Sequence, residues 1–131
     1  ANAGVDPAIM GIATSSNEDI RAAVALAVRK IESPEVESLL GKLAVDSSVS
    51  VRLSAVSVLV ERNGENTAPL LKTICEKDPH EGVRLEAIEY FAGCTSQNVT
   101  AVQVLTDLSQ NDPSENIRTY ASNALKNMAA E

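Results

Sequence analysis

One histidine and two cysteines are the residues whose side chains could act on a substrate or hold a metal ion. His80 stands beside Glu81, and an imidazole next to a carboxylate can ligate a metal or transfer a proton. A metal site needs more ligands than this pair supplies. No group of basic residues surrounds Cys75 or Cys94 to stabilise a nucleophilic thiolate. We therefore expect no metal, no cofactor and no catalytic residue, and hence a protein that is not an enzyme.

The two cysteines are expected to be reduced. Cys75 is near the end of one expected helix, and Cys94 follows the far end of the next, roughly 15 Å beyond Arg84. A disulfide would require the two Cα atoms to lie within about 7 Å of each other. Cys75 follows the apolar Ile74, so we interpret it as a buried side chain. Free thiols are typical of a reducing compartment, which favours a cytoplasmic location.

Arginine and aspartate recur at regular spacing along the chain. An aliphatic residue followed by arginine occurs four times, at intervals of 31, 32 and 34 residues. These pairs are Ile20-Arg21, Val51-Arg52, Val83-Arg84 and Ile117-Arg118. The residue six positions before each arginine is Ser15, Asp46, Asp78 and Asp112, in that order. Such self-similarity predicts a repeat protein.

Each aliphatic–arginine pair opens a helical pattern, and we name the four expected helices the A helices. The aliphatic residue is followed four and eight residues later by other apolar residues, which is the spacing of one helix face. These faces are Ile20, Val24 and Val28; Val51, Ala55 and Leu59; Val83, Ala87 and Phe91; and Ile117, Ala121 and Leu125. The residue in the middle is small, so a neighbouring helix can pack closely there.

A second kind of expected helix, the B helix, follows each of the first three A helices after a turn. The apolar positions of the B helices are Val36, Leu39, Leu40 and Leu43; Leu70, Leu71 and Ile74; and Val104, Leu105 and Leu108. Residues 5–21 align without gaps on residues 36–52, so the chain opens with a B half-repeat. The sequence thus predicts one all-α domain over residues 1–131, an α–α superhelix (α-solenoid) of about seven antiparallel helices. Its half-repeats are 5–15 and 113–131, and its full repeats are 16–46, 47–78 and 79–112.

The expected helix starts carry capping residues. Ser15…Glu18, Asp78…Glu81 and Asp112…Glu115 each fit a capping box. The Asp-Pro pairs at residues 6–7, 78–79 and 112–113 predict proline at the first helical position. Asn98 is expected to start a helix, although Asn98-Val99-Thr100 also fits a glycosylation sequon. Asn63-Gly64 is expected to form a tight turn.

These repeats resemble the HEAT repeat, in the short variant often called phycobilisome-lyase-like. The pattern of that family is Asp, then five residues, then Val-Arg, with Ala and Leu following at helical spacing. The resemblance covers roughly residues 5–129 and implies a ladder of ion pairs between neighbouring repeats. The ladder residues would be Arg21, Asp46, Arg52, Asp78, Arg84, Asp112 and Arg118. Because Ser15 replaces the first aspartate, the partner of Arg21 is left open, and each aspartate could instead cap its own helix.

Composition excludes several classes of partner. The formal charge is −7, and a surface that binds phosphates would need clustered Lys and Arg. We therefore expect no nucleic acid. No apolar run approaches the roughly 20 residues that span a bilayer, so we expect no membrane insertion. Aromatic residues make up 2% of the chain, which is few for a ligand-binding cleft.

The outward side of the B helices is the remaining candidate surface, because partners often bind the concave side of HEAT-like arrays. The residues expected there are Lys42, Lys72, Thr73, Glu76, Gln103 and Asp107. The row is polar and of mixed charge. It has no aromatic anchor of its own, since Tyr90 and Tyr120 fall on A helices.

The resemblance leaves three functions open. The favoured one is a non-enzymatic scaffold or adaptor that binds another protein, as part of a longer repeat protein and as a monomer or weak end-to-end dimer. The second is a bilin lyase or chaperone-like subunit handling a tetrapyrrole or its acceptor protein, for which the concave side offers only Lys42 and Lys72 as cations. The third is an extracytoplasmic sensor domain of a membrane protein. An iron enzyme similar to deoxyhypusine hydroxylase would need several His-Glu pairs, and the chain has one.

Overall fold

The computed structural model describes residues 6–130, apart from the side chain of Glu65. Within these residues the secondary structure is helical, with no strand. The chain forms two compact units, Ala1–Gly64 (unit 1) and Glu65–Glu131 (unit 2). The division falls inside the repeat predicted at 47–78, at the turn between its A and B helices.

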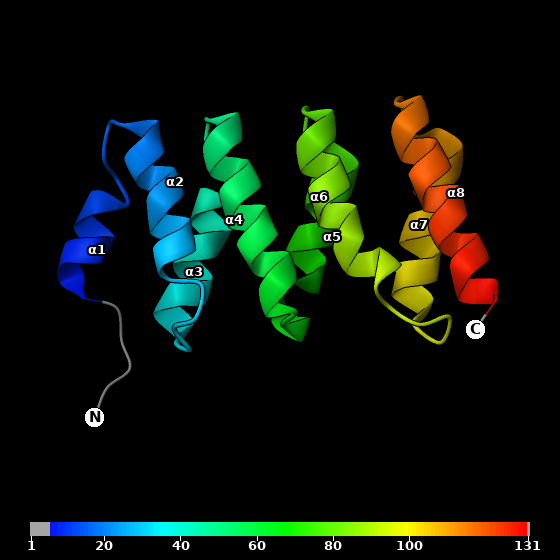
Figure 1. Cartoon of the computed structure of the whole chain (residues 1–131), viewed down its shortest axis with the longest axis horizontal. Coiled ribbons are helices and arrows are strands. Elements are labelled where there is room, and N and C mark those ends of the chain that lie inside the picture. Colours follow the sequence, from blue (N-terminus) through cyan, green and yellow to red (C-terminus); the bar gives the residue numbers. More distant parts are fainter. Residues whose placement is uncertain (1–5, 131) are drawn as a thin grey trace. The chain divides into compact units, whose positions relative to one another are not determined.

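The described residues of unit 1 form four helices (Figure 1). They are α1 (Pro7–Ile12), α2 (Glu18–Ala27), α3 (Pro34–Leu43) and α4 (Val49–Arg62). The two A helices, α2 and α4, pack on each other, and α3 packs on both. The short α1 packs on α2. The core of unit 1 includes Val24, Leu40 and Leu59, each less than 3% exposed.

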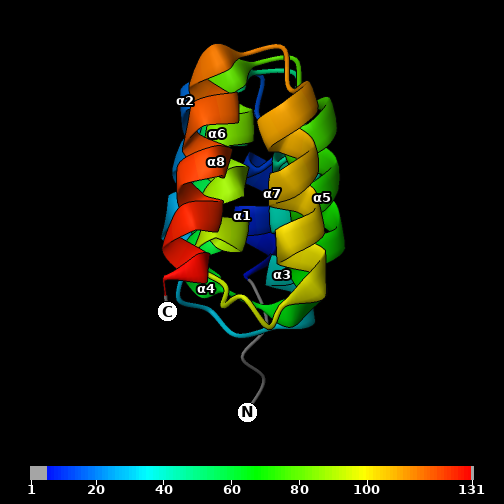
Figure 2. The ribbon, with the colours of Figure 1, turned by 90° about the vertical axis from the view of Figure 1, so that its right-hand side faces the viewer.

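Unit 2 repeats this arrangement with longer helices. It contains a 3-10 turn, η1 (Glu65–Thr67), and the helices α5 (Ala68–Lys77), α6 (Glu81–Ala92), α7 (Val99–Asn111) and α8 (Glu115–Ala129). The A helices α6 and α8 lie in one layer and the B helices α5 and α7 in the other (Figure 2). α6 packs on the other three helices, and Phe91 and Ile88 on α6 are buried among them.

The starts of the A helices lie two residues later than the sequence predicted. The N-caps of α2, α6 and α8 are Asn17, His80 and Ser114, so the three predicted capping boxes are wrong. The residues predicted as caps form a turn outside the helix, because each side chain accepts a hydrogen bond from the backbone N–H two residues on. These donors are Asn17 for Ser15, His80 for Asp78 and Ser114 for Asp112.

The prolines show the same shift. Pro79 and Pro113 precede the N-cap, so they do not occupy the first helical position. Pro7, by contrast, follows the N-cap Asp6 as predicted. Asn98 caps α7 as expected, and Asn63 ends α4 in the left-handed conformation at φ 55°, which confirms the tight turn.

Most of the predicted apolar faces are buried. Leu70 and Leu125 are half-buried, and the clear exceptions are Ile12 in the first half-repeat and Ile20 in the helix that follows it. Ile20 is 41% exposed and Ile12 is 49% exposed, although their counterparts Val51 and Leu43 are buried. The prediction was wrong there because α1 has six residues where α3 has ten. Within residues 6–130, no A helix precedes α2 to cover these side chains. Val5, at the start of the predicted half-repeat, lies outside the described residues.

The all-α fold of repeated antiparallel helix pairs, the α-solenoid class predicted from the sequence, is confirmed. The described residues form eight α-helices, one more than the expected number of about seven. The boundaries of the individual repeats remain predictions.

Candidate interaction surface

The four arginines of the aliphatic–arginine pairs share one backbone contact. In each case Nη1 donates a hydrogen bond to the carbonyl oxygen of the residue six positions earlier, in the turn before its own helix. The contacts are Arg21 to Ser15 at 2.8 Å, Arg52 to Asp46 at 2.9 Å, Arg84 to Asp78 at 2.9 Å and Arg118 to Asp112 at 2.7 Å. The guanidinium thus satisfies a carbonyl that the helix leaves without a partner, and its own orientation is fixed.

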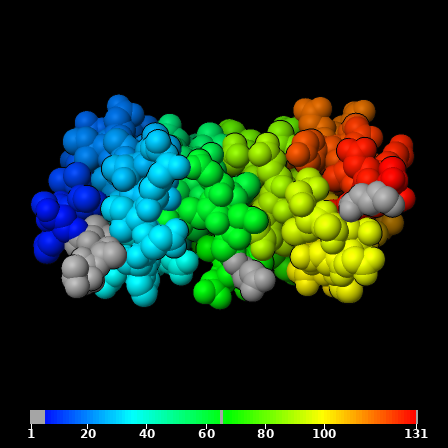
Figure 3. Space-filling view, turned by 60° about the horizontal axis from the view of Figure 1, so that its bottom comes forward, coloured from blue at the N-terminus to red at the C-terminus, as the bar shows by residue number. Residues whose placement is uncertain are grey.

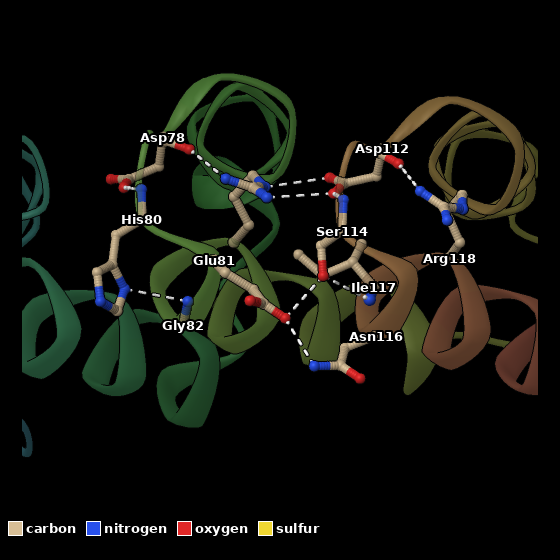
Figure 4. Close-up of polar contacts among 10 residues, drawn as sticks. Asp78, His80, Glu81, Gly82, Asp112, Ser114, Asn116, Ile117 and Arg118 are labelled. Carbon is tan, nitrogen blue, oxygen red and sulfur yellow. Dashed lines mark hydrogen bonds and ion pairs between the residues drawn. The ribbon is translucent and has the colours of Figure 1, made fainter.

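Arg21 and Arg84 also hold the aspartate that precedes the next A helix along the chain. In unit 1, Arg21 donates from Nε and Nη2 to the two carboxylate oxygens of Asp46, both at 2.9 Å. In unit 2, Arg84 makes the same pair of bonds to Asp112, both at 3.1 Å (Figure 4). Each pair is bidentate, which is the strongest geometry for an arginine and a carboxylate. Arg21, whose partner the sequence left open, is therefore paired, because the contact runs forward to the aspartate before the next A helix.

Asp46 and Asp112 each bind an arginine and a backbone N–H, but neither is the N-cap of its own helix. Asp46 accepts the backbone N–H of Ser48 at 2.9 Å, and Asp112 accepts that of Ser114 at 2.8 Å, while both hold an arginine. The hydrogen bond from Arg21 and then that from Ser48 hold the pKa of Asp46 below its ordinary value, against the opposing effect of burial. The same pairing raises the pKa of Arg21. The carboxylates therefore order the turns before α4 and α8 and connect each turn to the preceding A helix.

Glu81 makes a contact between repeats that the sequence did not predict. Its Oε1 accepts hydrogen bonds from Ser114 Oγ at 2.7 Å and from Asn116 Nδ2 at 3.1 Å (Figure 4). These two bonds, in that order, lower the pKa of Glu81. The local pattern had assigned Glu81 to a capping box, and nothing within one repeat indicates a partner 33 residues away.

The histidine and the cysteines occupy structural positions. His80 is exposed, and its Nδ1 accepts the backbone N–H of Gly82 at 3.0 Å, so the imidazole caps α6. Cys75 is fully buried, as predicted, and burial raises the pKa of its thiol. Cys94 donates from Sγ to the carbonyl of Tyr90 at 3.4 Å, and both thiols are free. Among residues 6–130, no group of three His, Cys, Asp or Glu side chains could hold a metal ion.

The predicted row on the B helices is accessible. Glu76 is half-buried, and the other members, Lys42, Lys72, Thr73, Gln103 and Asp107, are exposed. Lys72 and Glu76 form an ion pair at 3.3 Å across one turn of α5. Asp107 accepts a hydrogen bond from Asn111 at 2.8 Å on α7. Surface pairs of this kind contribute about 0.2–1 kcal/mol to stability. A partner could therefore replace them with contacts of its own at little cost.

A hollow of about 440 Å³ adjoins this row at one end of α5 and α7. Pro69 and Lys72 of α5 line one side, and Asn98 and Thr100 line the other. Tyr90 and its neighbour Phe91, whose ring centroids are 5.0 Å apart, line it as well. The sequence assigned Tyr90 to an A helix and left the row without an aromatic anchor. The end of α6 in fact brings this ring to the hollow beside Lys72.

A second hollow of about 370 Å³ lies at the other end of α5 and α7. Glu76 and Asp107 line it together with Asn111. The row in unit 2 therefore runs from an aromatic hollow to a polar one. None of the helices within residues 6–130 combines the length and the apolarity needed to cross a bilayer.

Comparison with known proteins gives one match. A family model described as HEAT repeats matches residues 5–92, which is about two thirds of the chain. No curated protein and no solved structure matches.

Proposed function

Because this chain belongs to the HEAT-repeat family, we propose that it is a non-enzymatic module that binds another protein, as a scaffold or adaptor. HEAT repeats generally mediate protein–protein interaction, and the family is typically non-catalytic. The free thiols of Cys75 and Cys94 support a reducing compartment such as the cytoplasm.

The observation that carries this proposal is the aromatic hollow beside the B-helix row of unit 2. Protein interfaces are typically anchored by a Tyr, Trp or Arg set in a pocket and surrounded by polar contacts. Tyr90 provides the ring, Lys72 a charge at its edge, and Thr73 and Gln103 exposed polar groups on the helices that flank it.

Affinity capture with a paired variant tests the proposal. Lys42→Glu combined with Lys72→Glu reverses the two positive charges of the row, and both side chains are exposed, so the fold should tolerate the change. We expect recovery of the bound protein to fall about tenfold. The new glutamates would repel the acidic groups of a partner that binds the two lysines.

Lys30→Glu combined with Lys126→Glu is the matched control. It makes the same change in net charge at exposed positions outside the row. The control should capture the same partner as the wild type. Recovery that is equal for all three proteins would contradict the assignment of the row as the binding surface.

A further inference from the structure

Arg118 is the last of the four arginines in the aliphatic–arginine pairs, and one edge of its guanidinium is open. Nη1 donates to the carbonyl oxygen of Asp112 at 2.7 Å, the contact that the other three arginines also make in their own turns. Nε and Nη2 have no acceptor among residues 6–130. Figure 4 shows this part of the side chain pointing away from Asp112. Glu115, one turn earlier on α8, is exposed and forms no ion pair within the described residues.

The same two donors bind a carboxylate at two other places in the chain. Nε and Nη2 of Arg21 bind Asp46, and those of Arg84 bind Asp112, with one carboxylate oxygen for each nitrogen. In both arginines the Nη1 contact fixes the guanidinium in the orientation that receives the carboxylate. Arg118 keeps this contact, so its open edge is ordered in advance and binding costs little side-chain entropy. The group that this edge fits is therefore a carboxylate.

The side of α8 that carries Arg118 lies at the surface of unit 2. Ser122 and Leu125 follow it by four and seven residues, which places them on the same side of the helix, and all three are half-buried. In Figure 2, α8 and α7 lie in front of the other two helices of the unit. Figure 3 shows the orange-to-red atoms of α8 at the surface beside the yellow atoms of α7. We name Arg118, Ser122 and Leu125 the Arg118 face.

The Arg118 face differs from the same face of the other A helices. Ser122 takes the position of an apolar residue that is 0% exposed in each of the others, namely Ala25, Val56 and Ile88. Leu125 is half-buried, whereas its counterparts are at most 1% exposed, namely Val28, Leu59 and Phe91. A further A helix packed on this face would bury the hydroxyl of Ser122, which is costly without a hydrogen-bond partner. The face therefore suits a partner with polar groups better than another helix of the repeat.

A second copy of the chain, stacked as a further repeat, would bring no carboxylate to Arg118. The position that Asp46 and Asp112 occupy before their A helices is taken by Ser15 before the first one. The hydroxyl of Ser15 accepts the backbone N–H of Asn17, as the aspartates do in their own turns, but it carries no charge. A carboxylate for this edge therefore has to come from a different protein.

We propose that the Arg118 face binds an aspartate or glutamate side chain of a partner protein. The carboxylate accepts one hydrogen bond from Nε and one from Nη2, in the geometry by which Arg84 holds Asp112. The half-buried Leu125 packs against the apolar part of the same partner segment. This inference rests on the proposed protein-binding function, but it assigns a separate surface, on the A-helix layer and away from the B-helix row.

A nuclear magnetic resonance titration that observes the arginine Nε–H groups tests the inference. The probe is the blocked peptide acetyl-Asn-Asp-Pro-Ser-amide, which copies residues 111–114, and acetyl-Asn-Asn-Pro-Ser-amide is its uncharged match. We expect a saturable shift of the Arg118 signal with the aspartate probe only. The signals of Arg21 and Arg84 should not move, because their carboxylate-binding edges are already occupied.

Two variants distinguish the paired donors from simple charge. Arg118→Lys keeps the charge but loses the two parallel N–H groups. Binding of the aspartate probe, followed at the backbone amides of Ser122 and Leu125, should weaken about fivefold. Lys126→Gln removes an exposed positive charge about 80° around the helix from Arg118 and should bind the probe as the wild type does. The comparison of the two probes uses the wild type, so it remains decisive even if Arg118→Lys fails to fold.

Several outcomes would overturn the inference. These are an Arg118 signal that does not move, an equal shift with the asparagine probe, equal shifts of all three arginines, and undiminished binding by folded Arg118→Lys. A shift that appears without probe as the protein concentration rises would also overturn it, because the occupant would then be a second copy of the chain. If any of these occurred while capture still depended on Lys42 and Lys72, the proposed function would stand and only the Arg118 face would be refuted.

Discussion

Units 1 and 2 each contain an arginine–aspartate ion pair of the same geometry, but the two pairs differ in burial. In unit 1 the side chains of Arg21 and Asp46 are 15% and 14% exposed, whereas in unit 2 those of Arg84 and Asp112 are 8% and 2% exposed. The hydrogen-bond pattern is the same in both. The helix packed beside the arginine differs, because α1 has six residues where its counterpart α5 has ten. The repeat motif therefore fixes the geometry of the pair, and the neighbouring helix sets how much water reaches it.

The surfaces of the units differ more than their cores. Unit 1 carries eight acidic and six basic residues, which is nearly balanced, whereas unit 2 carries ten and five. The excess in unit 2 includes Glu86 and Glu89 on α6. Both tyrosines of the chain also lie in unit 2, at Tyr90 and Tyr120, and each lines a hollow. Core positions are constrained by packing, so differences at the surface are the better guide to function.

The largest expected effect is that of a charge placed in the core of unit 2. Ala87 is fully buried at the middle of the A-helix face, so Ala87→Asp should lower the free energy of unfolding by more than about 3 kcal/mol. Urea unfolding followed by tyrosine fluorescence measures this, because both tyrosines are in unit 2. Ala23→Asp, at an exposed position of α2, is the control and should change stability by less than about 0.5 kcal/mol. A wild-type midpoint for Ala87→Asp would show that this position is accessible to water.

The next effect compares the two ion pairs directly. Asp112→Asn and Asp46→Asn keep the oxygen that accepts the backbone N–H two residues on, and both remove the negative charge. We expect Asp112→Asn to lower the free energy of unfolding by about 3 kcal/mol, because it leaves Arg84 buried without a counter-charge. Asp46→Asn should cost less than about 1 kcal/mol, because water can solvate Arg21.

Urea unfolding followed by circular dichroism gives both free energies under one condition. Equal losses for the two variants would mean that burial does not control the strength of these pairs. The proposed link between the burial of each ion pair and its contribution to stability would then be wrong, although the hydrogen bonds themselves would be unaffected.

The helices were predictable because their information is local. The spacing of Val83, Ala87 and Phe91, for example, defines one helix face without reference to any other segment. The pairing of arginine with aspartate was expected only from the resemblance to the HEAT repeat, since spacing alone does not say which charged side chains meet. The exact helix starts were not, because Asp-x-x-Glu fits both a capping box and a turn that precedes the N-cap. Only the backbone conformation shows that Asp78 belongs to the turn before the N-cap and is not the N-cap of a capping box.

Features that depend on neighbouring repeats were harder to predict. The sequence of α2 cannot indicate that Ile20 is exposed, because that depends on the length of α1. The contact of Glu81 with Ser114 and the approach of Tyr90 to the hollow beside Lys72 depend on how successive helices are offset. A periodic pattern identifies which face of a helix is buried. It does not indicate where a polar residue at the edge of that face will find its partner.

The smallest expected effect is the pH dependence of the stability that the ion pair of unit 1 contributes. Arg21 holds the pKa of Asp46 below its ordinary value of 3.8. A carboxyl whose pKa is lower in the folded state stabilises the protein fully above the unfolded pKa, and this stabilisation is lost as the pH falls through the folded pKa. The difference in unfolding free energy between wild type and Asp46→Asn should therefore stay constant from about pH 7 to about pH 5 and shrink below about pH 4. Urea titrations of both proteins across this range measure it, and a difference that instead grew on acidification would show that Asp46 gains its stabilising role as the neutral acid, with Arg21 held by its contact to Ser15 alone.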